Sequence, residues 1–63
     1  MSSKELYKKK FEELLVAEEK ARDFYKYYMG NVKDLRISEK LKLIYGDECK
    51  HVEIAKKFID ILS

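Results

Sequence analysis

Two side chains in the second half of this 63-residue chain have the types and spacing to bind a metal ion together. Glu48 and His51 are three residues apart, close to one helical turn, so a helix would present both on one face. Carboxylates and neutral imidazoles are common ligands of divalent transition metals. In the first half of the chain, Glu18 is the only charged residue within an apolar periodic stripe. These three residues are the candidate ligands, provided that the fold brings them together.

The residues around these groups recur at steps of three and four, which is typical of helices packed lengthwise against other helices. In the first half, the stripe consists of Tyr7, Phe11, Leu14, Glu18, Ala21, Tyr25 and Tyr28. In the second half, it consists of Ile37, Leu41, Ile44, Glu48, His51, Ala55, Phe58 and Leu62. The pattern predicts a helix over about 3–29 and a second helix over about 38–62, joined by a turn over about 30–37.

The helix ends carry recognisable signals. Ser2 followed by Glu5 has the spacing of a capping box, and Gly30 with its following residue is a helix-stop signal. Three residues are suitable N-caps for the second helix, which leaves its start open: Asn31, Asp34 and Ser38. Gly46 lies inside the second helix, where it either permits close approach of a neighbouring helix or is simply tolerated.

A short turn makes the two helices antiparallel neighbours and puts the candidate ligands at one level. From a turn centred near residue 34, a rise of about 1.5 Å per residue places Glu18 roughly 24 Å away, and Glu48 and His51 roughly 21–26 Å away. Two helices cannot enclose a core alone, and one cysteine allows no intrachain disulfide. We therefore expect an all-α fold: one antiparallel hairpin that associates into a four-helix bundle across a homodimer, with larger assemblies of dimers also open.

Twofold symmetry would double the candidate ligands at that level. One Glu from each of two helices and Glu-x-x-His from each of the other two make the ligand set of carboxylate-bridged dinuclear sites. Two divalent cations balance four carboxylates, which would otherwise repel one another in an apolar interior. Mixed oxygen and imidazole ligands suit iron or manganese better than calcium, and the absence of thiolates argues against a structural zinc cage.

Two segments also resemble a known family. Residues 17–25 are similar to the first metal-binding helix of rubrerythrin-type ferritin-like proteins, and residues 47–51 are similar to the second. The nearest resemblance is to encapsulated ferritins, in which each chain is half of a ferritin bundle. The shared features are the Glu, an aromatic–Tyr pair six and seven residues later, and Glu-x-x-His thirty residues on. The resemblance covers about 14–58.

The resemblance implies that Glu18, Glu48 and His51 are iron ligands, with the two Glu residues including the bridging carboxylates. It implies two iron ions per dimer, with manganese or zinc as substitutes, and oxidation of Fe(II) by oxygen or peroxide. It also places Tyr25 near the site as a fourth candidate catalytic residue, for which packing or a hydrogen bond is favoured over a redox role. The chain departs from full rubrerythrins because it has no rubredoxin-like cysteine cluster, only Cys49.

The alternative from a different class is a structural or interaction module. In that case the hairpin dimerises and binds metal only for stability or not at all, and the Glu-x-x-His pair lies at the edge of a helix seam. The net charge of +2, with both signs interspersed, gives no reason to expect nucleic acid. There is no apolar run long enough for a transmembrane helix, and no export signal accompanies the single cysteine, so we expect no membrane partner and a cytoplasmic protein.

Overall fold

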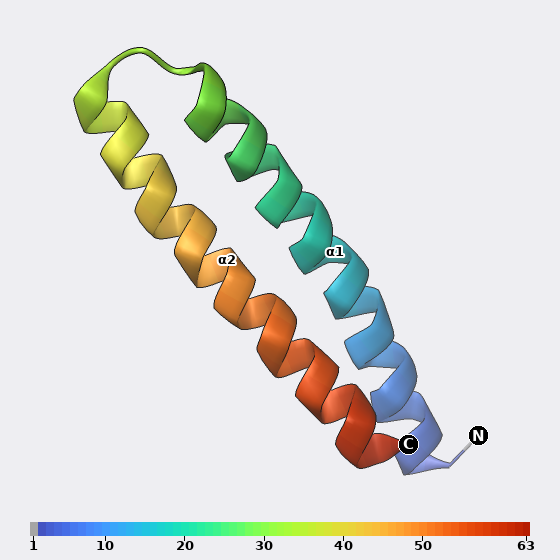
Figure 1. The fold of residues 1–63 in the computed structure, drawn as a ribbon. Helices are drawn as coiled ribbons and strands as arrows, with labels where there is room; N and C mark the ends of the chain where they lie inside the picture. Colours follow the sequence, from blue (N-terminus) through green and yellow to red (C-terminus); the bar gives the residue numbers. More distant parts are fainter. Residues whose placement is uncertain (1) are drawn as a thin grey trace.

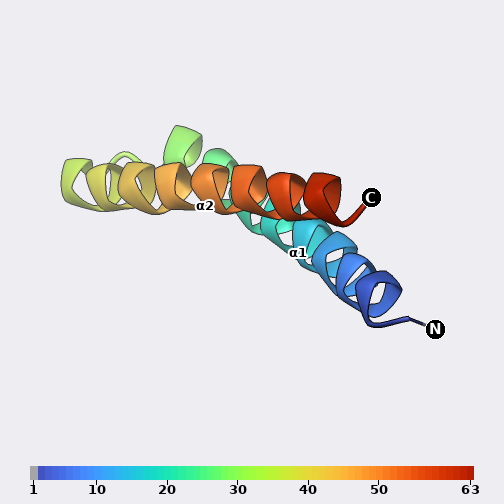
Figure 2. The same cartoon turned by 90° about the horizontal axis from the view of Figure 1, so that it is seen from below.

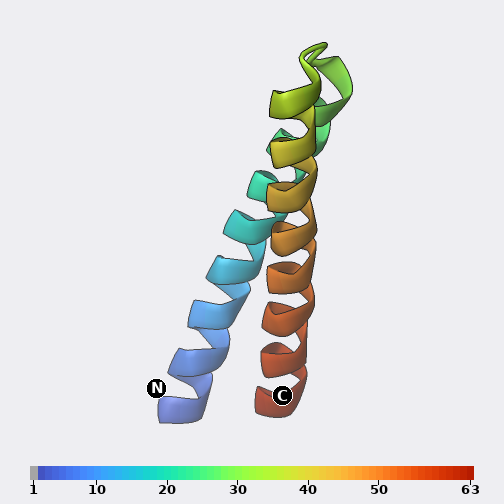
Figure 3. The ribbon, with the colours of Figure 1, turned by 90° about the vertical axis from the view of Figure 1, so that its left-hand side faces the viewer.

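The computed structural model describes residues 2–63, which form two helices and no strand. Helix α1 spans Ser3–Asn31 and helix α2 spans Leu35–Leu62. The helices lie side by side and antiparallel, with the turn at one end and both termini at the other (Figure 1). The predicted all-α hairpin is therefore confirmed. It is a rod of about 49 × 14 × 11 Å, and the turned views show its two helices crossing at an angle (Figures 2 and 3).

The start of α1 follows the sequence signal, whereas its end does not. The Glu5 amide donates to Ser2 Oγ at 3.2 Å, so Ser2 is the predicted N-cap. Gly30 does not stop the helix: its φ is not positive, and α1 continues through it to Asn31. The helix ends because Val32 is extended, at φ −86° and ψ 129°, although the Val32 amide still donates to the Tyr28 carbonyl.

The turn is shorter than the predicted 30–37, because Asp34 is the N-cap that the chain uses. One carboxylate oxygen of Asp34 accepts from the amides of Arg36 at 2.9 Å and Ile37 at 3.2 Å. Helix α2 therefore begins at Leu35, three residues before the predicted position. Satisfying two unpaired amides of the first turn in this way stabilises a helix start by about 1 kcal/mol.

The packing between the helices divides the predicted stripe of α2 into two rows. Leu41, Glu48, Ala55 and Leu62 form the closed row, whose members are all buried or half-buried. Ile37, Ile44, His51 and Phe58 form the open row, whose members are all exposed. In α1 the residues of the stripe also divide: Phe11, Glu18, Ala21 and Tyr25 are half-buried, whereas Tyr7, Leu14 and Tyr28 are exposed. Contacts within the chain therefore leave about half of the predicted stripe exposed.

The core between the helices is small. Val52 and Ala55 are the only buried residues among positions 2–63, with exposed fractions of 2% and 0%. Val52 was not part of the predicted stripe, although it lies three residues before Ala55 and so shares its face. Nearer the termini, the rings of Phe11 and Phe58 stack across the hairpin with centroids 4.7 Å apart.

Candidate metal centre

The hairpin brings the three predicted ligands together near the middle of both helices. Glu18 comes from α1, and Glu48 and His51 come from consecutive turns of α2. One ligand atom from each of these residues lies within 4.8 Å of the other two. The level predicted from the helical rise is therefore the level at which the structure places these side chains.

The imidazole of His51 faces both carboxylates through the same nitrogen. His51 Nδ1 lies 3.4 Å from Glu18 Oε2 and 3.8 Å from Glu48 Oε2. The Glu18 and Glu48 side chains are 20% and 17% exposed, whereas that of His51 is 52% exposed. The cluster therefore has a shielded carboxylate side between the helices and an open side that carries the imidazole.

The electrostatics of the cluster disfavour two bare carboxylates. The pKa of Glu48 is raised, first by its contact with the Glu18 side chain, then by burial and by repulsion from the Glu18 charge, with His51 acting in the opposite direction. Glu48 Oε2 is buried and accepts no hydrogen bond within residues 2–63. A buried acceptor without a partner costs about 1–3 kcal/mol, so Glu48 favours either a proton or a cation at this position.

The donors fit a divalent transition metal in type and number. Two carboxylates and one imidazole nitrogen converge, and the orphaned oxygen of Glu48 is available for coordination. Cys49 is a free, half-buried thiol that lies outside this group, in keeping with a set of oxygen and nitrogen ligands. Within residues 2–63, a single chain offers three ligand residues at this level, fewer than a dinuclear site requires.

The structure does not bring Tyr25 into the cluster. Its ring packs edge-on against Phe24, with centroids 5.3 Å apart, and no hydrogen bond joins its hydroxyl to Glu18, Glu48 or His51 within residues 2–63. Seven helical positions separate Tyr25 from Glu18, which is about 10 Å along the axis. Its assignment as a catalytic residue stays a prediction.

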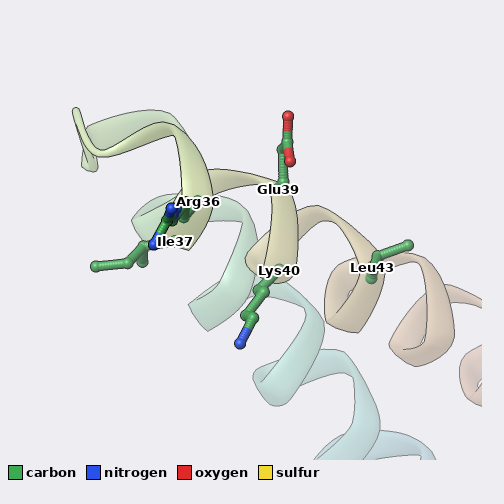
Figure 4. A pocket seen from close by; sticks show the side chains of 5 residues that line it. All are labelled: Arg36, Ile37, Glu39, Lys40 and Leu43. Atoms are coloured by element: carbon green, nitrogen blue, oxygen red, sulfur yellow. The ribbon is translucent and has the colours of Figure 1, made fainter.

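Tyr45 and Cys49 face a different groove of the hairpin. They line it with Arg22 and Asp23 of α1, whose side chains form an ion pair at 3.2 Å. The neighbouring Cys49 side chain raises the pKa of Tyr45. Another groove lies at the start of α2, where the lining side chains fan out around the first turns of this one helix (Figure 4). Neither groove is lined by a candidate ligand.

The comparisons with known proteins add no relative: no family model, no curated protein and no solved structure matches this chain. Within residues 2–63, neither helix combines the length and the apolar character needed to cross a membrane. The geometry of the cluster and the sequence pattern around it are therefore the features that indicate a function.

Proposed function

We propose that two copies of this chain form a dinuclear iron centre that oxidises Fe(II) with oxygen or peroxide, as in the ferritin-like proteins that its two motifs resemble. The observation that carries the proposal is the convergence of Glu18, Glu48 and His51, from two helices, to within 4.8 Å. Two such hairpins related by a twofold axis would supply four carboxylates and two imidazoles, which is the ligand set of bundle dinuclear sites.

Two further observations support the proposal. The raised pKa of Glu48 and its orphaned oxygen indicate a site that favours additional positive charge. A hairpin with two buried residues has too small a core to be stable alone, so a second copy is needed. The open row of α2, which is exposed beside the cluster, is the surface on which that copy would pack. Covering the open row would also shield His51 from water.

Each of the three residues would have a defined role in binding the metal ions. Glu18 and Glu48 would hold the two metal ions, and His51 would bind through Nδ1, the nitrogen that already faces the carboxylates. When bound, the two ferrous ions supply the electrons that reduce oxygen or peroxide. The protein's contribution is to balance the positive charge of the metal ions with carboxylates, to fix the ligands on two rigid helices and to exclude bulk water from the site.

An anaerobic titration with Fe(II), followed by addition of peroxide, tests this function. We expect binding of one iron per chain and rapid formation of Fe(III). Glu18→Gln should abolish both effects, whereas Glu19→Gln, the same change one position along α1, should preserve them. A protein that binds no iron, or a Glu18→Gln variant that binds and oxidises iron as the parent does, would overturn the proposal.

The second candidate function is an association module without redox chemistry. It is favoured by the exposure of Ile37, Ile44 and Phe58, because a second copy would cover these residues whether or not metal is bound. The titration separates the two functions: a stable dimer that takes up no Fe(II) is the result expected for the module alone.

A further inference from the structure

Helix α2 carries a second periodic surface beside its contact with α1, and two of its residues, His51 and Phe58, lie at the border, facing Glu18 and Phe11 of α1. This surface combines the open row with an outer row consisting of Lys40, Asp47, Ile54 and Ile61. Each row repeats every seven residues, and the two rows are three residues apart, as are positions a and d of a coiled coil. All eight members are exposed in the hairpin. No contact between α1 and α2 requires Ile54, which is 50% exposed, or Ile61, which is 72% exposed.

The two rows are complementary to each other when the helix is reversed. Consider α2 paired antiparallel with α2 of a second copy, with position 49 at the centre of the pair. Each residue then faces the residue of the copy that lies the same number of positions from 49 in the opposite direction. Ile37 then faces Ile61, Ile44 faces Ile54, and Phe58 faces Lys40. In the layer between the two Ile44–Ile54 layers, His51 faces Asp47. A twofold interface requires such reciprocity, because residue i contacts j and j contacts i.

We propose that α2 pairs in this way with α2 of a second copy, and that Asp47 is a positioning residue for the histidine of that copy. The Asp47 carboxylate accepts the Nε2–H of His51 across the pair. The pairing is argued from exposure and spacing alone, whereas the consequence for metal binding rests on the proposed function. The metal centre is then incomplete in a single chain for two reasons: it lacks half of its ligands, and it lacks the acceptor that orients each imidazole.

The contacts of His51 Nδ1 leave the other ring nitrogen, Nε2, free to donate to this acceptor. Its Nδ1 faces Glu18 and Glu48, so Nε2 is on the opposite edge of the ring, on the half-exposed side of the cluster. Within residues 2–63, neither His51 Nε2 nor the Asp47 carboxylate forms a hydrogen bond or ion pair. Histidines that bind metal usually donate their second N–H to a carboxylate, carbonyl or water, which fixes the tautomer and the ring orientation.

Disulfide trapping of the metal-free protein tests the pairing without reference to iron. In a Cys49→Ala background, Ile44→Cys and Ile54→Cys chains are mixed and oxidised mildly. The proposed register brings position 44 of one chain opposite position 54 of the other, so a covalent mixed dimer should form. Chains with Ile44→Cys alone should not cross-link, because two copies of position 44 would lie about 15 Å apart along the axis, beyond the reach of a disulfide.

A register control completes the trapping experiment. Ile61→Cys mixed with Ile44→Cys should give no mixed dimer, since position 61 faces position 37 in this pairing. Cross-linking of Ile44→Cys with itself, or equal yields from both mixtures, would overturn the proposed register. These outcomes are independent of metal, so the pairing can stand if the iron chemistry fails, and it can fail if the iron chemistry stands.

The role of Asp47 is tested on the single histidine of the chain, which gives one imidazole in a ¹⁵N spectrum. In the metal-free parent we expect Nε2 to be protonated and its proton to exchange slowly with water. Asp47→Ala should lose this protected signal, and Asp47→Asn, which keeps an acceptor, should retain part of it. Asp60→Ala, the same change on an exposed face away from the two rows, should leave the signal unchanged.

The consequence for the metal is measured on the same variants by anaerobic Fe(II) binding. Loss of an outer carboxylate typically weakens metal affinity about 10–100-fold, which is the range expected for Asp47→Ala, with a smaller loss for Asp47→Asn. A merely structural role would lower the stability of the dimer without changing the state of the imidazole. An Asp47→Ala variant with an unchanged imidazole signal and unchanged iron affinity would overturn the assignment.

Discussion

The closed and open rows of α2 have similar apolar content but different environments. Ala55 of the closed row is buried against α1, whereas Ile44 and Phe58 of the open row stay exposed beside it. The difference does not come from residue type, because the open row holds the larger apolar side chains. It comes from geometry: a hairpin provides each helix with one neighbour, and one neighbour covers only part of a wide apolar stripe.

The candidate metal centre lies on the boundary between the two rows. Glu48 belongs to the closed row and is 17% exposed, whereas His51 belongs to the open row and is 52% exposed. The carboxylate pair is therefore assembled within one chain, and the imidazole side stays open. Variants in each row, and at the boundary between them, test whether the two rows have different partners.

The largest effect is expected at Val52, where α2 contacts α1. Val52→Asp places a charge without a partner at a site that is 2% exposed, which should cost about 3 kcal/mol or more. We expect the helical circular dichroism signal to be lost at every protein concentration. A variant that stays fully helical would contradict the assignment of this residue to the core of the hairpin.

A charge placed in the open row should instead weaken the association of two chains. Ile44→Asp leaves the contact between α1 and α2 intact but adds a charge to the surface assigned to the second copy, at a cost of about 2 kcal/mol of association. The midpoint of thermal unfolding should fall, and it should recover as protein concentration is raised. A midpoint equal to that of the parent at micromolar concentration would show that this row stays uncovered.

Glu18, which faces the boundary between the two rows from α1, allows metal binding and stability to be measured separately in a Glu18→Leu variant. The change removes a ligand and should abolish iron binding. It also removes a charge that repels Glu48, so the metal-free assembly should be at least as stable as the parent, and more stable by about 1 kcal/mol if packing is good. Chemical denaturation of both proteins in the presence of a chelator provides the measurement, and a clear loss of metal-free stability would contradict the repulsion.

The pH dependence of Glu48 gives a further test on metal-free protein. Its raised pKa means that the folded state favours the protonated carboxyl, so its stabilising contribution is present at low pH and is lost as the pH rises through that pKa. Glu48→Gln, a neutral mimic, should match the parent in acid and become the more stable of the two towards neutral pH. Parallel denaturation curves at every pH would contradict the raised pKa.

The smallest effect is expected at Gly46, away from both rows. Its φ is not positive, and a Cβ added there would meet no atom within 4 Å. Gly46→Ala should therefore stabilise α2 by roughly 0.5–1 kcal/mol, as measured by thermal unfolding. A destabilised variant would indicate that a second chain approaches this glycine, the alternative that the sequence left open.

The sequence predicts the level of the candidate site well, because helical rise is regular. Counting residues from the turn was sufficient to place Glu18 beside Glu48 and His51. The exact turn could not be predicted, since Asn31, Asp34 and Ser38 compete as caps and the outcome depends on local backbone geometry. Gly30 was misleading for the same reason: glycine permits a left-handed helix end but does not impose one.

The division between the two rows could not be predicted either. A stripe with steps of three and four predicts which residues share a helix face, but it does not show which of them the other helix of the same chain will cover. Val52 was missed because it flanks the stripe, on the side that the crossing of the helices brings against α1. The orientation of His51 depends on side-chain geometry, which a residue pattern does not contain.

Native mass spectrometry of protein loaded anaerobically with Fe(II) tests the central claim most directly, because it counts chains and metal ions in the same particle. The account predicts particles with even numbers of chains and one iron per chain, starting with two chains and two irons, and loss of the metal in Glu18→Gln. Single chains that hold iron, or paired chains that hold none after loading, would contradict it.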